Sequence, residues 1–315
     1  MFYSIEPMHI PDGFLSTTVS ILMWIVSLVV VGFALSRVNR DLDERKLPLM
    51  GVLAAAIFAG QMLNFTVIGG TSGHLMGSAI ATILLGPWPA VLVLTTVVSV
   101  QALIFQDGGL LVLGANIFNM AVIGVFVAHF VYRTIYGLFK GRRWGIYAGG
   151  FVAAWISIVV ASLAVGLELA ISGTSPANIA IPAMAGIHSL IGVGEGLITV
   201  GALGLINATR PDLLEAKATP KKSDMVVWIG GLLLAVLLAI LSPFASAYPD
   251  GLEWVAEQKG FLDISQGPLY QIIPDYVMPG LANEALATII AGIIGALIVF
   301  VVAIGTVWIR RSARD

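Results

Sequence analysis

The sequence predicts an all-α fold, a polytopic bundle of transmembrane helices. Of its 315 residues, 58% are hydrophobic and only 11% are charged, and the mean hydropathy is +0.97. Soluble globular chains carry about 25% charged residues, so this composition is typical of a protein built for a bilayer. Apolar segments of about 20 residues, the length that a helix needs to cross the hydrocarbon core, recur along the chain.

We identify nine apolar segments as candidate spans. The third is short, and Pro87, which stands between Gly86 and Trp88, separates it from the fourth because proline breaks helices. If these two segments instead formed one kinked span, the count would be eight. The nine segments cover approximately residues 15–36, 48–68, 74–86, 88–104, 113–136, 145–170, 183–207, 225–243 and 284–309.

Four basic clusters decide between these two counts. With nine spans and the N-terminus outside, all four clusters face the cytoplasm, and Lys259 alone of the 16 Lys and Arg residues lies outside. With eight spans the clusters would divide across the membrane, against the positive-inside rule. We therefore expect nine spans in a cell membrane and a cytoplasmic C-terminus. The clusters are Arg37, Arg40, Arg45 and Lys46; Arg133, Lys140, Arg142 and Arg143; Arg210, Lys217, Lys221 and Lys222; and Arg310, Arg311 and Arg314.

Several classes of chemistry are missing from the sequence. The chain has no cysteine, which excludes disulfides, thiolate metal sites and thiol nucleophiles. It has no phosphate-binding loop of the Gly-x-x-x-x-Gly-Lys-Ser/Thr type, no His-Glu-x-x-His motif and no Gly-x-Ser-x-Gly elbow. We therefore expect no catalytic residues, no resident cofactor, no nucleic-acid partner and no enzymatic activity.

The segment Met8-His9-Ile10-Pro11-Asp12-Gly13-Phe14 carries the most informative chemistry. If Met8 is the amino-terminal residue, its free amine, the backbone nitrogen of His9 and the His9 imidazole Nδ1 can chelate one ion. A second imidazole completes a square-planar set of four nitrogens, the geometry that suits Ni(II) or Cu(II). If Met1 is the amino-terminal residue, Met8 offers only an amide and this chelate cannot form.

His74 is the predicted fourth ligand. It follows the glycine-rich stretch Gly69-Gly70-Thr71-Ser72-Gly73 at the outer end of a span, on the same face as His9. Glycines allow another backbone, such as an inserted N-terminal segment, to approach closely. The alternative is an interfacial histidine solvated by lipid headgroups. The stretch 244–280, also on this face, is acidic, and an acidic surface attracts cations.

Other polar residues lie near the outer ends of spans or within them. His188 and Glu195 lie two turns apart on one helix face, and a carboxylate inside a membrane is usually paired or lines a polar path. We expect Asn116 or Asn119 to bond Glu195, and these residues either surround the metal or join helices. Gln61 and Asn64 are expected to bond the inserted segment, with Ser72 in the neighbouring turn.

Small residues mark one face of the second span. The spacings Ala55-x-x-x-Ala59 and Ala56-x-x-x-Gly60 allow close contact between helices. This face packs either against helices of the same chain or against a partner protein. The spacing alone favours packing within the chain.

Three motifs together resemble the CbiM/NikM family, the substrate-binding membrane subunits of cobalt and nickel energy-coupling factor transporters. The resemblance covers about residues 8–210. A further stretch, residues 243–261, is similar to the PDGLE module of a small accessory subunit. The three motifs are Met8 to Leu15, Gly69 to Gly77, and Gly108 to Leu111 followed by Gly114 to Met120.

The resemblance implies a seven-helix core with two accessory helices, and metal ligation by Met8, His9 and His74. It implies import of Ni²⁺ or Co²⁺, with a slight preference for nickel; cobalt would feed cobalamin biosynthesis. It also implies three partners, a transmembrane coupling subunit and two cytoplasmic ATPases, and we assign docking of the coupling subunit to Ala55, Ala59 and Gly60. A rival hypothesis is a stand-alone transporter that relays protons through Glu195 and His188; another is a membrane enzyme of cobalamin assembly, for which no motif is found.

The expected organisation has four parts. Residues 1–7 form a leader that is absent or removed, and residues 8–210 form the metal-binding membrane domain. Residues 211–224 are a polar, basic cytoplasmic linker, and residues 225–315 form the accessory domain with two spans.

Overall fold

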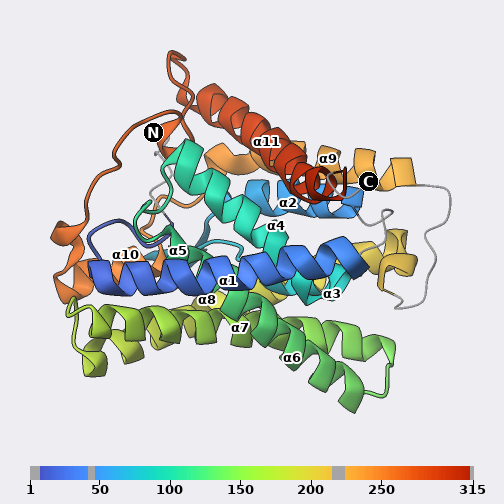
Figure 1. The fold of residues 1–315 in the computed structure, drawn as a ribbon, viewed down its shortest axis with the longest axis horizontal. Helices are drawn as coiled ribbons and strands as arrows, with labels where there is room; N and C mark the ends of the chain where they lie inside the picture. Colours follow the sequence, from blue (N-terminus) through green and yellow to red (C-terminus); the bar gives the residue numbers. More distant parts are fainter. Residues whose placement is uncertain (1–7, 42–46, 215–223, 313–315) are drawn as a thin grey trace.

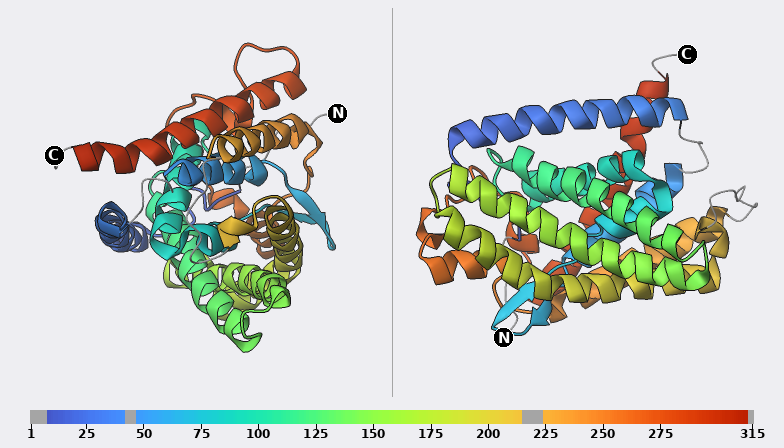
Figure 2. Two further views of the ribbon diagram at one scale, coloured as in Figure 1. Left: turned by 90° about the vertical axis from the view of Figure 1, so that its right-hand side faces the viewer. Right: turned by 90° about the horizontal axis from the view of Figure 1, so that it is seen from below.

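A computed structural model describes residues 8–41, 47–214 and 224–312. Its helices run mostly along the long axis of the molecule (Figure 1). Helix α1 lies along the outside of the bundle (Figure 2). The helices are α1 (Thr17–Asp41), α2 (Leu47–Gln61), α3 (Ser78–Leu85), α4 (Pro87–Val100), α5 (Leu113–Ile117), α6 (Gly124–Leu138), α7 (Arg143–Ile171), α8 (Ala177–Thr209), α9 (Asp224–Leu241), α10 (Gly251–Lys259) and α11 (Glu284–Ser312).

Helix occupies each of the nine predicted segments, and the prediction of a helical membrane bundle is confirmed. Six helical stretches of the described chain are long and apolar enough to cross a membrane: α1, α4 with its extension, α5 to α6, α7, α8 and α11. Helices α2 and α9 are shorter apolar helices. Gly86 separates α3 from α4, because its φ of 83° and ψ of 171° are not helical. This conformation is open essentially only to glycine.

The chain departs from regular α-helix at one hairpin and at two π-helical stretches. Residues Phe65–Val67 (β1) and Thr71–Gly73 (β2) form an antiparallel hairpin, where the end of a helical span and a glycine turn are predicted. The hairpin is rich in β-branched and aromatic residues, which favour strands. Gln101–Phe105 and Phe118–Ile123 are π-helical, a form that concentrates at functional sites.

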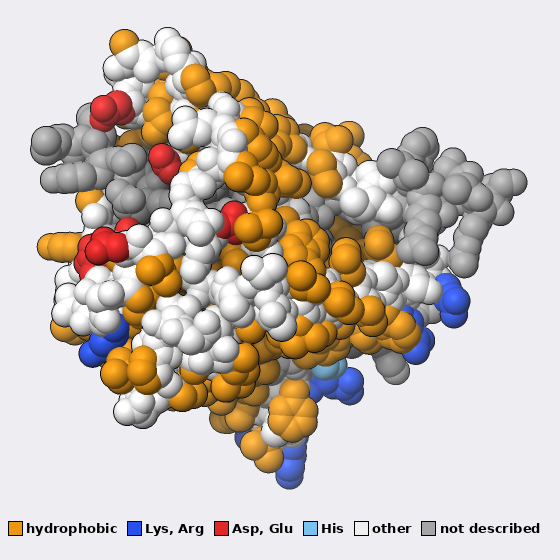
Figure 3. Space-filling view, turned by 60° about the vertical axis from the view of Figure 1, so that its left-hand side comes forward, with side chains coloured by type: hydrophobic (Ala, Val, Ile, Leu, Met, Phe, Trp, Pro, Cys, Tyr) orange, Lys and Arg blue, Asp and Glu red, His pale blue; other side chains and the backbone are white. Residues whose placement is uncertain are grey.

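The surface of the molecule is divided by charge. Acidic side chains gather mostly at one end and Lys and Arg mostly at the other, with apolar side chains between them (Figure 3). Ile21, Leu28 and Val29 of α1 are among the exposed apolar residues of this middle zone. Such a belt is the surface that a bilayer solvates favourably.

The small-residue face of α2 is occupied inside the chain. Ala55 and Ala59 are completely buried, and α2 packs against α9 and α11. A side-chain carbon added to Gly60 would meet Leu75 and Leu238. Close packing is what small residues permit. The assignment of Ala55, Ala59 and Gly60 to partner docking is therefore wrong for this structure, and the alternative of internal packing is correct.

Candidate functional site

Residues 8–14 are inserted into the bundle rather than lying over it. Met8, Ile10 and Phe14 are buried in the core. Asn116 holds the segment with both ends of its amide: Oδ1 accepts from the Ile10 N–H at 3.0 Å, and Nδ2 donates to the Ile10 carbonyl at 3.1 Å. The Gly109 N–H also donates to that carbonyl. The segment is thus fixed at its backbone, by bonds in which the His9 side chain takes no part.

Asp12 anchors the same segment further along. Its carboxylate accepts hydrogen bonds from the N–H groups of three successive residues, Leu110, Leu111 and Val112. Three successive N–H groups directed at one anion form a backbone nest. The glycine-rich loop before Leu110 allows this approach, since a side chain on Gly109 would collide with Asp12. The motif Gly108 to Leu111 therefore receives the inserted segment.

His74 lies in the short segment that links β2 to α3. The Met76 carbonyl accepts a hydrogen bond from Gln61 Nε2 at 3.1 Å. The Met76 and Gly77 N–H groups donate to the carboxylate of Glu195, at 2.8 and 3.0 Å. The short chain between His74 and α3 is thus fixed from two other helices, α2 and α8.

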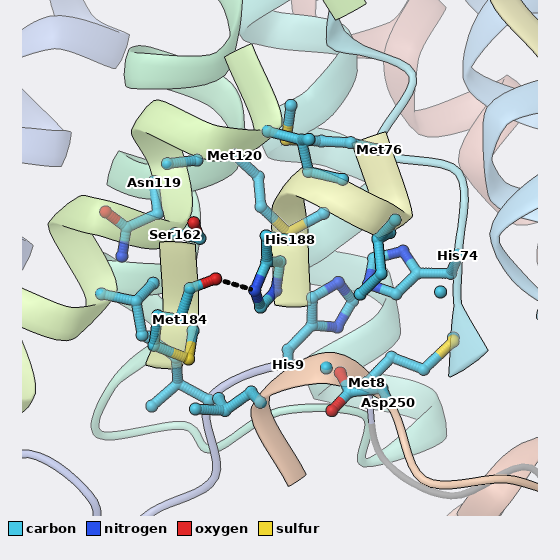
Figure 4. A pocket seen from close by; sticks show the side chains of 18 of the residues that line it. Met8, His9, His74, Met76, Asn119, Met120, Ser162, Met184, His188 and Asp250 are labelled. Carbon is cyan, nitrogen blue, oxygen red and sulfur yellow. Dashed lines mark hydrogen bonds between the residues drawn. The ribbon is translucent and has the colours of Figure 1, made fainter. Parts of the chain in front are cut away.

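A cavity of about 90 Å³ brings three of the four histidines of the chain together. His9, His74 and His188 line it (Figure 4), and the ring centroids of His9 and His74 are 5.5 Å apart. His188 Nδ1 lies 2.8 Å from the Met184 carbonyl, which can only accept, so Nδ1 carries the proton and Nε2 keeps a lone pair. Other lining groups are Met8, Met76, Asn116, Asn119, Met120, Ser162, Met184 and Asp250.

Asp107, which the sequence analysis did not select, is the acidic partner of this site. Its Oδ1 accepts from the Met8 N–H at 2.7 Å and lies 3.0 Å from His9 Nδ1. Its Oδ2 accepts from the Tyr276 hydroxyl at 2.6 Å. Two nitrogens of the predicted chelate therefore meet at one oxygen of Asp107. Only its place directly before the motif that begins at Gly108 could have indicated Asp107.

The charges of this pair stabilise each other. Burial lowers the pKa of His9, but the nearby Asp107 carboxylate outweighs that effect, so the pKa of His9 is raised above its usual value. Burial raises the pKa of Asp107, but His9 and the hydrogen bonds from Tyr276 and Met8 outweigh that effect, so the pKa of Asp107 is lowered below its usual value. Burial raises the pKa of Asp250 to about 8.

The C-terminal region contacts every segment that carries a predicted ligand. The Ser72 N–H donates to the Pro249 carbonyl and its hydroxyl to the Tyr248 carbonyl, both at 2.8 Å. The Gln266 N–H donates to the Asp12 carbonyl at 2.7 Å. With Tyr276 on Asp107, these bonds hold the hairpin, the inserted segment and the loop after residue 105.

The structure corrects three predicted partners. Gln61 bonds the chain after His74 and not the inserted segment, and the Asn64 carbonyl accepts from the Ser246 N–H. Glu195 bonds backbone N–H groups rather than Asn116 or Asn119. Asn119 instead donates to Glu168 at 2.8 Å. Sequence spacing places such residues at the right depth, but the rotation of the helices selects their partners.

The donor set limits what the site can bind. Among the described residues, no three side chains of His, Cys, Asp or Glu converge in a way that could hold a metal ion. An ion at His9 and His74 would therefore need main-chain nitrogens as well. The Met8 nitrogen, which lies beside His9 Nδ1 at the same Asp107 oxygen, is the candidate if Met8 is the amino-terminal residue. Such nitrogen-rich sites suit late first-row divalent metals.

Comparison with known proteins identifies relatives over almost the whole chain. Residues 9–213 match the family described as the cobalt uptake substrate-specific transmembrane region, CbiM, and residues 225–312 match the PDGLE domain. A putative fused nickel transport protein NikMN of Archaeoglobus fulgidus is 39% identical over 97% of this chain and 100% of its own. The fused nickel transport protein NikMN of Rhodobacter capsulatus is 32% identical over 79% of this chain and 76% of its own.

A solved structure shares the fold of most of the chain. The crystal structure of a truncated transition metal transporter aligns with a TM-score of 0.58 and 34% identity. The alignment covers 64% of this chain and 99% of the solved one.

Proposed function

This chain belongs to the CbiM family of cobalt uptake substrate-specific transmembrane regions, and from that premise we propose that it binds Ni²⁺ or Co²⁺ for import. The ion is the substrate, and the proposed ligands are the Met8 nitrogen, the backbone nitrogen and Nδ1 of His9, and His74. The preference is for nickel, because four nitrogens in a plane suit Ni(II). We assign no catalytic role to any residue.

One observation carries this proposal. Met8 N and His9 Nδ1 both lie within 3.0 Å of the same oxygen, Asp107 Oδ1, so the two nitrogens are neighbours, and the His74 ring lies beside that of His9. A metal needs deprotonated nitrogens, and binding therefore releases protons. A deprotonated His9 amide and the Asp107 carboxylate together balance a divalent charge, which a buried site requires.

The chelate needs a free amine on Met8. We therefore propose that Met8 is the amino-terminal residue of the working protein, either by the start of translation or by removal of residues 1–7. Those seven residues lie outside the described part of the chain. What supports this proposal is that Met8 is buried beside His9, with its nitrogen 2.7 Å from Asp107 Oδ1.

We further propose that energy comes from partner proteins. The chain has no phosphate-binding loop, so a transmembrane coupling subunit and two cytoplasmic ATPases would supply ATP hydrolysis. The inserted segment would face the outside and capture the ion there. With the small-residue face of α2 buried, the coupling subunit would dock elsewhere on the chain.

The rival proton-relay transporter gains no support from the contacts of its two residues. Both oxygens of Glu195 accept from backbone N–H groups, and His188 bonds Met184. Uptake of Ni²⁺ by vesicles that contain this chain alone, without any ATPase, would favour the rival.

Native mass spectrometry of the full chain with equal Ni²⁺ and Co²⁺ tests the proposal. We expect a mass that begins at Met8 with one ion bound, and measurable but much weaker binding in His74→Ala, which keeps only the nitrogens of Met8 and His9. His129→Ala is the matched control, because His129 lies on α6 away from the cavity and should leave binding unchanged. A chain that begins at Met1 and still binds one ion would exclude the amine chelate.

A further inference from the structure

Glu195 is a buried carboxylate in an unusual place. It lies in the interior of α8 and is 0% exposed. Its Oε2 accepts from the Met76 N–H at 2.8 Å, and its Oε1 from the Gly77 N–H at 3.0 Å. An ionisable group inside a membrane helix is unfavourable and usually has a functional reason. Here both oxygens are directed at one short piece of chain.

That piece of chain is the connection between a predicted ligand and a helix. Met76 and Gly77 follow His74 by two and three residues, and α3 begins at Ser78. The first N–H groups of a helix have no partner within the helix. Gly77, whose φ is 77°, is the N-cap of α3 and has no side chain that could cap the helix. The Glu195 carboxylate of α8 instead accepts from the N–H groups of the two residues before α3.

The Met76 peptide is fixed on both sides. While Glu195 accepts from its N–H, Gln61 Nε2 donates to its carbonyl at 3.1 Å. His74 Nδ1 itself lies only 3.2 Å from its neighbour's carbonyl, that of Leu75, and no other hydrogen bond holds the ring among the described contacts. The ring direction is therefore set by the backbone that follows it.

We propose that Glu195 is the positioning residue of His74: it fixes the backbone at residues 76–77 so that the imidazole faces Met8 and His9 before an ion arrives. This inference rests on the proposed function, since it concerns the same site. Fixing a ligand in advance removes the entropy of ordering it on binding. Partners that orient metal ligands typically change affinity by 10–100-fold.

A second buried carboxylate provides the comparison. Glu168 of α7 is also buried and accepts from Asn119 at 2.8 Å. It is a buried glutamate like Glu195, but its partner is a side chain and not the segment that follows His74. If burial of any carboxylate mattered, both residues would matter equally.

A double-mutant cycle on the full chain tests the proposal. Glu195→Gln keeps the shape but sets an NH₂ group against a backbone N–H. We expect Ni²⁺ to bind about tenfold more weakly, as for loss of one hydrogen bond to a charged group. In a His74→Ala background, Glu195→Gln should change the dissociation constant by less than about twofold, because the positioned ligand is gone. Glu168→Gln is the control, with affinity unchanged.

Each other outcome has a definite meaning. An equal tenfold loss with and without His74 would overturn positioning and assign Glu195 a general structural role. Unchanged affinity in Glu195→Gln would also overturn it. If His74→Ala alone leaves binding intact, the proposed function fails instead. Should Glu195→Gln fail to fold, Gln61→Met removes the opposite anchor of the Met76 peptide, and its effect should likewise vanish without His74.

Discussion

Asp107 is the residue on which the site depends most. One oxygen serves Met8 and His9, and the other accepts from Tyr276, which stacks on Phe105 with ring centroids 4.9 Å apart. Asp107 is 2% exposed, so water cannot replace any of these partners. It therefore joins the inserted segment to the C-terminal region.

Replacing Asp107 by alanine should destabilise the protein strongly. It leaves His9, the Met8 N–H and the Tyr276 hydroxyl buried without their acceptor. Removing one partner of a buried ion pair costs about 3–5 kcal/mol. Thermal unfolding in detergent should show a large fall in Tm for Asp107→Ala. The exposed Asp263 is the control, and Asp263→Ala should leave Tm nearly unchanged. Equal Tm values for the two variants would refute the assigned role.

For single residues, the sequence motifs predicted His9 and His74 as ligands on the same face of the membrane. The structure brings both side chains to one cavity. The same reasoning missed Asp107 and paired Glu195 with the wrong residues. Asp107 is 98 residues from His9 in the sequence, and a lone acidic residue in a glycine-rich loop carries no signal of its partner. Local chemistry identifies candidate ligands, whereas their partners depend on how distant segments meet.

Among the elements, the loop that follows residue 105 is shaped to receive another chain segment. Gly109 allows Asp12 to reach the N–H groups of Leu110 to Val112, and its own N–H donates to Ile10. A glycine at position 109 is therefore what allows residues 8–14 to pack against this loop. The sequence predicted close approach at the other glycine stretch, before His74, but not at this one.

Gly109→Ala should disturb the insertion. The added methyl group would overlap Asp12, and overpacking typically costs 1–3 kcal/mol. We expect a lower Tm and weaker Ni²⁺ binding by titration. Gly186→Ala is the matched control, because nothing lies near Gly186 and alanine favours a helix. A Gly109→Ala protein with unchanged Tm and affinity would show that the loop can move aside.

The whole molecule has two ends of opposite charge, as Figure 3 shows. The basic clusters whose side chains are described include Arg37, Arg142 and Arg210, whereas Lys259 belongs to α10 at the other end (Figure 1). This separation agrees with the orientation that the positive-inside rule predicts. The orientation itself stays a prediction.

Cysteine labelling tests that orientation on a chain without native cysteine. Lys259 and Arg142 are both exposed. In intact cells, a membrane-impermeant thiol reagent should label Lys259→Cys but not Arg142→Cys, and both should react after the membrane is opened. Labelling of Arg142→Cys alone in intact cells would invert the proposed orientation.

The sequence by itself determined the class of the protein, because the length and composition of apolar segments decide whether a chain enters a bilayer. It also determined the candidate ligands, because the chemistry of a Met-His segment is local. Only the tertiary structure decided which groups surround them, that α2 is covered by α9 and α11, and that the C-terminal region holds the site segments. These depend on helix rotation and on contacts between residues far apart in the chain, which no local pattern encodes.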